Sequence, residues 1–390
     1  MEQEKRHIAI FLEYLESVPD PRQRRGQRHR LTDVLAIALL AVMCGADDAE
    51  AIEDWGDLNE EWLRTFLELK HGIPSQDTYL RLLGLLHPSA FKVFFERWVD
   101  ALMGKEPAGH VAIDGKTLRG SFDGASGKTA IHMVHAWSCE KNLLLGQVKT
   151  SEKSNEITAI PELLRLLDLR KSTVTIDAMG CQREIAATVR ERAAHYVIAV
   201  KDNQPTLRAN IAGFFADAER TKRALDEGPA PVVDEACDTD KGHGRIEERR
   251  CVFSRDLSWV EEPEKWKDLA GIGMVEATRT SLKTGKVGHE RRCYIISNPK
   301  TTASSLNDLV RAHWGIENKL HWVLDTAFDE DRCRTRMRNS AENLAIIRRL
   351  VINLLGQVPD KRKRSMRRRR RCCAMSRTYM LDALGIGPAS

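Results

Sequence analysis

The sequence has no apolar run long enough to cross a membrane. Its most apolar stretch, Val34 to Cys44, is far shorter than the ~20 residues of a membrane-spanning helix, so it predicts a core helix instead. The first six residues, MEQEKR, lack the long apolar segment that a secretion signal needs. We therefore expect a cytoplasmic protein that has no membrane partner.

Cysteines at metal-binding spacing are also missing. None of the nine cysteines forms a Cys-x-x-Cys pair or joins a His/Cys cluster at zinc spacing. Cys372 and Cys373 are adjacent, which makes joint ligation of one metal awkward, so we expect free thiols in a reducing compartment. No glycine-rich stretch has the spacing of a nucleotide-binding loop, and no nucleotide cofactor is expected.

Positive charge is distributed unevenly along the chain. The formal net charge is only +5, but basic residues crowd the segments Arg22 to Arg30 and Lys361 to Arg371. Such runs suit sequence-independent contact with nucleic-acid phosphates. We expect the second run to contact DNA phosphates or to become ordered on DNA. The alternative for both runs is a solvated or disordered segment.

The 390 residues are enough for two or three domains. Residues 1–107 predict an all-helical domain, because apolar residues recur at helical spacing within 31–43, 49–55, 79–83 and 89–103. The glycine- and proline-containing stretch 104–109 ends this domain. Together with its arginines it is a candidate for part of the DNA recognition. Packing on the rest of the chain, or a dimer contact, is the alternative.

From residue 108 to 356 the pattern predicts an α/β domain. Strands are expected at 111–114, 131–138, 143–149, 173–177 and 196–201, with helices at 155–167 and 182–194. This β-β-β-α-β-α-β order is the ribonuclease-H-like arrangement, in which the first and fourth strands are neighbours. A β-rich insertion is expected at about 206–300, then a helix from 304, a closing helix at 339–355 and a basic C-terminal tail at 357–390.

Three carboxylates occupy distinctive settings in this α/β domain. Asp114 and Asp177 each close a short apolar run, and Glu317 lies in a helical pattern. Acids at strand ends and on a neighbouring helix can converge on divalent cations, which prefer oxygen ligands. A pair of such ions activates water and stabilises an in-line phosphoryl displacement. The alternative for each aspartate is a turn cap. Gly115 is expected to permit a tight turn after Asp114.

The chain resembles the DDE transposases of bacterial insertion sequences, in particular the H-repeat-associated branch. The matching stretches lie in the family's order over roughly residues 18 to 356. They are Asp20 to Arg22, Leu31 to Leu35, Ala112 to Lys116, Thr175 to Ala178, Lys201 to Gln204, His313 to Glu317 and Leu320 to Trp322.

The resemblance implies metal-dependent DNA strand cleavage and strand transfer at the ends of a transposable element. It makes Asp114, Asp177 and Glu317 the catalytic and metal-binding residues, with Mg²⁺ as the cofactor and Mn²⁺ as a substitute. The implied partners are double-stranded DNA, as element ends and as target, and a second copy of the chain on that DNA. The β-rich insertion is also expected in the family.

Basic residues near the three acids are the candidate DNA contacts. They are Lys116, Arg119, Lys201, His243, Arg245, His313, Lys319 and His321. Ordinary surface positions and loop residues are the alternative for them. Asn203 is a candidate for organising the loop after the strand at 196–201. Related transposases often carry a tyrosine seven residues and an arginine four residues before the glutamate. Val310 and His313 stand there, so neither role is transferred, although a protonated His313 could bind phosphate.

Two further features leave alternatives open. Trp314 and Trp322 are expected to pack in the core rather than to stack on bases. The acids Asp325, Asp329, Glu330 and Asp331 form a cluster from which a different third ligand could come, although family position favours Glu317. Two other functions use the same features: a nuclease without strand transfer, and an inactive, domesticated DNA-binding protein, which the missing arginine keeps open.

Overall fold

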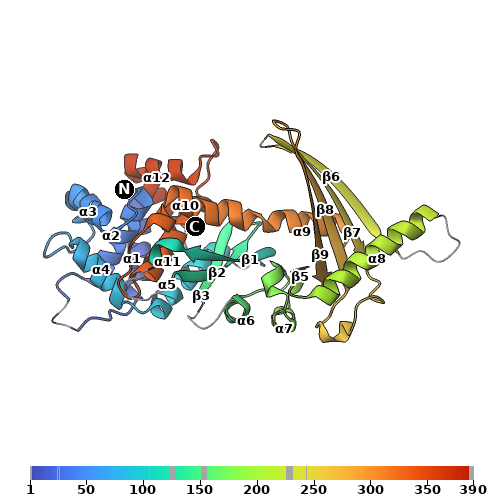
Figure 1. Cartoon of the computed structure of the whole chain (residues 1–390). Coiled ribbons are helices and arrows are strands. Elements are labelled where there is room, and N and C mark those ends of the chain that lie inside the picture. Colours follow the sequence, from blue (N-terminus) through green and yellow to red (C-terminus); the bar gives the residue numbers. More distant parts are fainter. Residues whose placement is uncertain are drawn as a thin grey trace.

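The computed structural model describes residues 2–385 except 24, 26, 105, 123–128, 151–155, 225–231 and 243. Its centre is a mixed sheet with the strand order β3-β2-β1-β4-β5-β9-β8-β7-β6 (Figure 1). The strands are β1 His110–Leu118, β2 Ile131–Ser138, β3 Leu143–Lys149, β4 Thr173–Ile176, β5 His195–Val200, β6 Asp234–Gly242, β7 Arg245–Ser254, β8 Gly271–Ser281 and β9 Val287–Ile296.

The pairing of β1 with β4 places two of the predicted acids on neighbouring strands. These strands run parallel, and Ile113 is the register partner of Ile176. Asp114 is the next residue of β1 and Asp177 is the first residue after β4, so they lie at the same level of the sheet. The predicted adjacency of the first and fourth strands is therefore confirmed, although 63 positions (177 − 114) separate the two acids.

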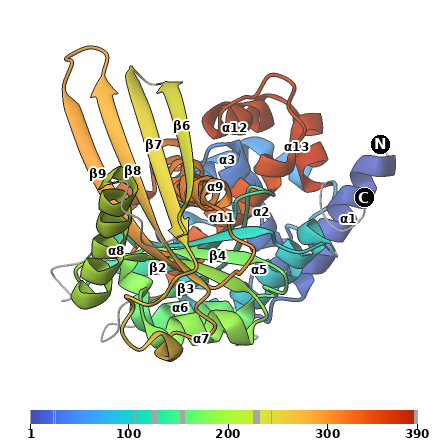
Figure 2. The same ribbon diagram turned by 90° about the vertical axis from the view of Figure 1, so that its right-hand side faces the viewer.

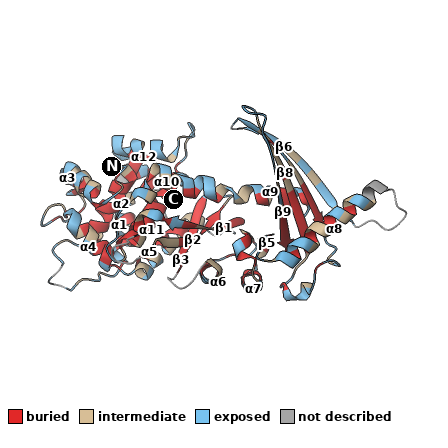
Figure 3. Ribbon diagram, viewed as in Figure 1, coloured by how far each residue is buried: buried red, intermediate tan, exposed pale blue. Residues whose placement is uncertain are grey.

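Helices cover both faces of this sheet. Figure 2 shows α6 Glu156–Leu166 and α7 Arg183–Glu191 on one face, with α9 Ala303–His313 and α11 Ser340–Gln357 on the other. Strands covered on both faces contain mainly apolar side chains, which explains why Val, Ile and Ala predominate in β5 and why threonine is the only polar residue type in β4. The sheet interior and α11 contain much of the buried core (Figure 3).

The expected all-helical N-terminal region is observed. It consists of α1 Glu2–Glu16, α2 Leu31–Cys44, α3 Ala49–Leu63, α4 Gln76–Leu85 and α5 Pro88–Met103. The apolar run in α2 is buried on all sides, by α1, α3, α11, α12 and α13, so α2 is a central core helix. None of the described helices is both long and apolar enough to cross a membrane.

Helix α11 joins the N-terminal helices to the sheet. The Asn353 side chain exchanges two hydrogen bonds with the backbone of Leu144 in β3, at 2.8 and 2.9 Å. The Asn343 amide donates to the carbonyls of Leu83 and Leu86 beside α4, at 2.7 and 2.8 Å. Since both asparagines are fully buried, these bonds are important: they satisfy the amide nitrogens of both side chains and the carbonyl oxygen of Asn353.

The C-terminal segment is folded, which differs from the predicted tail. Its helices α12 Met366–Met375 and α13 Arg377–Leu384 pack against α2, α11 and α1. Arg370 is only 4% exposed and donates to the carbonyls of Val42, in the last turn of α2, and Ala46, just after that helix. Part of the basic run is therefore structural, because buried guanidinium groups cap carbonyls. Other members of the run, such as Lys361, Lys363 and Arg371, are exposed.

The predicted insertion continues the central sheet rather than forming a separate body. Strand β9 pairs antiparallel with β5, and β8, β7 and β6 follow outward from it. The segment also contains α8 Pro205–Ala224, so the β-rich prediction missed a helix of 20 residues. The Gly/Pro-rich stretch 228–231 within this segment lies outside the described residues. Figure 1 shows this extension and the N-terminal helices at opposite ends of the molecule.

Candidate active site

The three predicted acids line one cavity of about 220 Å³. Asp114 comes from β1, Asp177 follows β4, and Glu317 opens the turn after α9. Pairing of β1 with β4 brings the two aspartates together. Glu317 is placed beside them by the preceding helix, α9, which packs on β1 and β4. Lys201, Arg292, His313 and Trp314 also line the cavity.

The backbone around Asp114 differs from the predicted turn. Strand β1 continues through Gly115 to Leu118, so Asp114 lies inside a strand instead of closing one. The glycine is explained by a close approach: a Cβ at Gly115 would overlap the side chains of Glu156 and His132. These two side chains are joined at 2.6 Å between Oε1 and Nε2.

Asp177 both caps a turn and faces the cavity. Its Oδ1 accepts a hydrogen bond from the Met179 amide at 3.0 Å, at the start of a short 3₁₀ turn. Asn203 donates from its amide to the Ala178 carbonyl at 2.6 Å, so it holds the loop after β5 against this turn, as predicted. Asp177 is therefore a turn cap, as the alternative had it, and it also lines the cavity.

Glu317 lies in a π-helical turn, Glu317–His321, followed by helix α10 Trp322–Ala327. His321 Nδ1 lies 3.0 Å from Glu317 Oε2 and 3.6 Å from Asp114 Oδ2. Within the described chain, ligand atoms of Asp114, Glu317 and His321 lie within 4.8 Å of one another. Asp177 lines the same cavity but lies outside this compact group.

The electrostatics of the site favour a bound cation. Burial raises the pKa of Asp114 to about 6, and the carboxylates of Asp177 and Glu156 add to this rise. The pKa of Asp177 is also raised, by burial and then by Glu156. Carboxylates crowded together out of water lack compensating charge, and a divalent cation with oxygen ligands supplies it. The donor set therefore fits a hard divalent ion.

Sequence comparison agrees with this arrangement. The family model described as "Transposase DDE domain" matches residues 105–354, and the model described as "DDE_Tnp_1-associated" matches residues 12–99. The chain belongs to the DDE transposase family. The predicted resemblance is thereby confirmed.

Relatives of this transposase match it over almost its whole length. "Putative transposase YncI" of Escherichia coli O157:H7 is 37% identical, covering 97% of this chain and 95% of its own. "H repeat-associated putative transposase YhhI" of Escherichia coli K12 is 36% identical, covering 97% and 98%. Among solved structures, a piggyBac transposase synaptic complex with hairpin DNA aligns with a TM-score of 0.44 at 12% identity, over 95% of this chain and 80% of that one.

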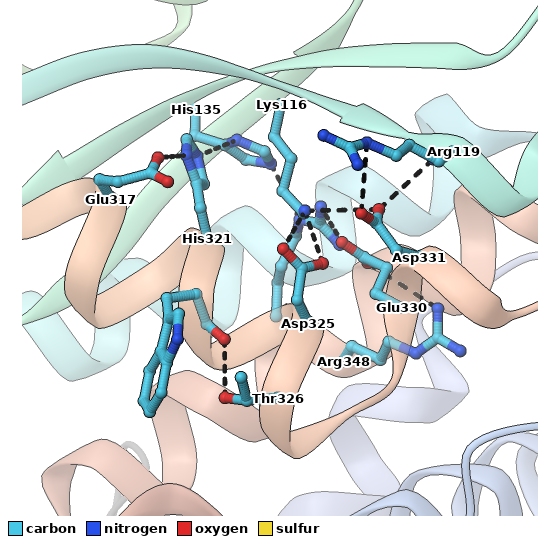
Figure 4. Close-up of polar contacts among 12 residues, drawn as sticks. Lys116, Arg119, His135, Glu317, His321, Asp325, Thr326, Glu330, Asp331 and Arg348 are labelled. Carbon is cyan, nitrogen blue, oxygen red and sulfur yellow. Dashed lines mark hydrogen bonds and ion pairs between the residues drawn. The ribbon is translucent and has the colours of Figure 1, made fainter.

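The acid cluster that follows Glu317 is used elsewhere in the transposase. Lys116 Nζ lies 2.7 Å from Asp325 Oδ1 and 3.6 Å from Asp331 Oδ1 (Figure 4). Glu330 is buried against Arg349 and Arg348, at 2.6 and 3.8 Å. None of the four acids at 325, 329, 330 and 331 is among the residues that line the cavity. This geometry favours Glu317 as the third acid.

Three of the predicted DNA contacts need correction: Lys116, His313 and His321. Lys116 is buried, and its ammonium group is held by Asp325 and Asp331, so it is not free to bind a phosphate. Burial, with His110 and Arg292 nearby, lowers the pKa of His313 to about 4, so His313 is neutral at neutral pH. Its Nδ1 is bonded to Thr175 Oγ1 at 2.8 Å instead.

His321 and the other candidates fall into three groups: exposed, buried and outside the described residues. Lys201 is exposed at the cavity, and Arg245 and Lys319 are exposed in a neighbouring cleft. Arg119 is 81% exposed, near Asp331. His321 is buried in the acid group, away from any surface where it could touch DNA freely. His243 lies outside the described residues.

Both tryptophans differ from the predicted core packing. Trp314 is 39% exposed and Trp322 is 60% exposed. The guanidinium carbon of Arg292 lies 4.4 Å from the centroid of Trp314, which is cation–π geometry. Helical spacing alone could not reveal this, because an apolar stripe looks the same whether it meets a core or a ligand. Sequence reasoning also missed His135 and Arg349, which lie behind the acids.

Proposed function

We propose that this protein is an insertion-sequence transposase that cleaves DNA at the ends of its element and transfers the resulting 3′-hydroxyl to target DNA. Residues 108–356 would form a ribonuclease-H-like catalytic domain, between a helical domain at 1–107 and a basic C-terminal segment at 357–390. The observation that carries the proposal is the convergence of Asp114, Asp177 and Glu317 on one cavity.

Asp114, Asp177 and Glu317 would hold the divalent metal, with Mg²⁺ as the expected ion and Mn²⁺ as a substitute. When bound, such ions supply activated water and stabilise the charge of an in-line phosphoryl displacement. The protein contributes positioning: β1 and β4 fix the two aspartates, and the Met179 amide orients Asp177. Lys201 is exposed beside the acids, where it can contact a DNA phosphate.

A second cavity extends the site toward the sheet extension. It has a volume of about 580 Å³ and shares Arg292, Trp314 and Glu317 with the first cavity. Its basic lining residues outnumber its carboxylates, Asp240, Glu247 and Glu317; they are Arg245, Arg249, Arg279, Arg292, Arg311 and Lys319. Several of these arginines pair with Glu247, Glu290 or Asp238, but the lining keeps a surplus of positive charge beside the catalytic acids, which suits a DNA strand. A dimer on DNA would bring two ends together.

Replacing Trp314 by alanine is expected to weaken binding of DNA that has a single-stranded end. Stacking of a base on an aromatic ring contributes about 1–3 kcal/mol, so the Kd should rise about 5- to 150-fold. Fluorescence anisotropy would measure it. Trp322→Ala is the matched control, because Trp322 is more exposed but does not line either described cavity. Equal effects of the two substitutions would contradict a stacking role for Trp314.

The exposed arginines of α12 are expected to bind DNA phosphates non-specifically. Arg367, Arg368 and Arg371 are exposed, whereas Arg370 is buried. Changing the three exposed arginines to glutamine should flatten the plot of log K against log salt by about 0.9 for each phosphate that is no longer neutralised. Binding titrations at several salt concentrations would show this for specific and random DNA alike. The triple lysine variant keeps the charge and should keep the slope.

The decisive experiment is a strand-transfer assay. Labelled DNA with the ends of the encoding element would be incubated with the protein, a plasmid target and Mg²⁺ or Mn²⁺. Joined products support a transposase. Nicked DNA without joining indicates a nuclease that stops after hydrolysis. DNA binding without metal-dependent nicking indicates an inactive DNA-binding protein.

A further inference from the structure

A chain of hydrogen bonds runs from the protein interior to the catalytic acids. Arg349 Nε lies 3.0 Å from His135 Nε2, and His135 Nδ1 lies 3.2 Å from His321 Nε2. His321 Nδ1 then faces Glu317 Oε2 at 3.0 Å. Figure 4 shows the two histidines in line behind Glu317. Arg349 and His135 are completely buried, and His321 is 3% exposed.

The donor and the acceptor of each hydrogen bond in this series follow from Arg349, where the series begins. A guanidinium group has only donors, so His135 Nε2 must be the acceptor of the bond from Arg349. The single ring proton of His135 then sits on Nδ1 and is donated to His321 Nε2. His321 Nε2 is therefore an acceptor as well, so the ring proton of His321 sits on Nδ1, facing Glu317.

Arg349 is held rigidly in this role. Its two terminal nitrogens bind both carboxylate oxygens of Glu330, at 2.6 and 3.3 Å, and one also donates to the Ala345 carbonyl at 2.9 Å. Glu330 is only 2% exposed. A bidentate ion pair out of water fixes the plane of the guanidinium group, so Nε stays directed at His135.

We propose that His321 is a positioning residue that donates its Nδ1 proton to Glu317, in a tautomer set by Arg349 through His135, and does not bind metal. This rests on the proposed function, in which Glu317 holds the metal ion. The hydrogen bond fixes one oxygen of Glu317, leaving the other for the ion. Distance alone would instead make His321 Nδ1 a third ligand atom beside Asp114 and Glu317.

Ligation through His321 Nδ1 would carry a structural cost. The ring proton would move to Nε2 and meet the Nδ1 proton of His135, so two donors would face each other in a dry interior. Moving the His135 proton from Nδ1 to Nε2 does not remove the clash, because the protonated Nε2 would then face the N–H of Arg349 Nε. A buried donor without an acceptor is unfavourable, and the arrangement thus selects the carboxylates as ligands.

NMR of full-length protein labelled with ¹⁵N-histidine tests the assignment directly. Long-range ¹H–¹⁵N spectra separate protonated from unprotonated ring nitrogens, and His321→Asn and His135→Gln spectra identify the two rings. Without metal, Nδ1 should be protonated and Nε2 unprotonated in both rings, and saturating Mg²⁺ should leave His321 unchanged. A proton on His321 Nε2, or loss of the Nδ1 proton on adding Mg²⁺, would overturn the proposal.

Two substitutions at His321 provide a second readout. Asparagine places an amide N–H close to the position of Nδ1, whereas leucine fills similar space without a donor. Titration calorimetry should show His321→Leu binding Mn²⁺ about 10- to 100-fold more weakly, with the affinity largely restored in His321→Asn. Equal losses in both variants, each with a wild-type circular dichroism spectrum, would contradict the donor role. If the wild-type protein never cleaves DNA, the proposed function is wrong. The NMR experiment tests the tautomers of His135 and His321 independently of cleavage.

Discussion

Replacing any one of the three acids by its isosteric amide should lower DNA cleavage by more than about a thousandfold, or over about 4 kcal/mol in the activation barrier. The variants are Asp114→Asn, Asp177→Asn and Glu317→Gln. Each removes a carboxylate charge at the cavity where they converge, so the site loses its hold on the metal. The fold and most of the DNA affinity should persist, because phosphate binding is spread over many basic residues.

A nicking assay with labelled end DNA measures the effect, and anisotropy checks DNA affinity in parallel. Asp329→Asn is a suitable control. Asp329 belongs to the neighbouring acid cluster and has a φ of 48°, a left-handed conformation that asparagine tolerates well. The Asp329→Asn variant should cleave DNA at the wild-type rate. Normal cleavage by Glu317→Gln, with loss in Asp329→Asn, would transfer the third-ligand role to the cluster.

Glu330→Gln is expected to destabilise the folded protein by about 3–5 kcal/mol. The change leaves the buried guanidinium groups of Arg349 and Arg348 without their counter-charge. Chemical denaturation followed by circular dichroism would measure it. Asp331→Asn, one residue away, removes a partly exposed carboxylate and should cost no more than about 1 kcal/mol. Equal costs would mean that Glu330 is not a structural anchor.

The same buried pair should make stability depend on pH. Burial by itself would raise the pKa of Glu330, but Arg349 and Arg348 outweigh it and lower the pKa overall. A carboxyl group with a lowered folded pKa contributes stability above its unfolded pKa of about 4.3, and this is lost as pH falls through the lower folded value. Below about pH 4 the wild type should therefore lose more stability than Glu330→Gln does.

Much of the molecule could be predicted from local sequence. Short apolar runs bounded by polar residues indicated the strands of the central sheet, and helical periodicity indicated α2 to α7 and α11, because each signal is contained within one element. The three acids could be singled out because each stands in a short motif. The order of strands then implied that β1 and β4 are neighbours, which the parallel pairing confirms.

Other features depended on partners distant in the sequence. Strand β6 reads as a polar segment because it lies at the sheet edge and is mostly exposed, and pairing with β7 defines it. The basic run near the C-terminus predicts a tail by composition, yet Arg370 is buried because α2 ends where its guanidinium group can reach the carbonyls. Composition reports charge, but only the neighbouring elements decide which charges are compensated.

The sequence by itself determined the family, the order of the elements from β1 to β5 and the acids that carry the proposed chemistry. Tertiary structure decided their surroundings. Lys116 forms an ion pair with Asp325, and Trp314 lines a cleft. His321 is hydrogen-bonded to His135, which in turn is bonded to Arg349. The physical reason is that an ion pair, an exposed ring face or a tautomer depends on atoms brought together from distant positions. Such interactions leave no periodic signal along the chain.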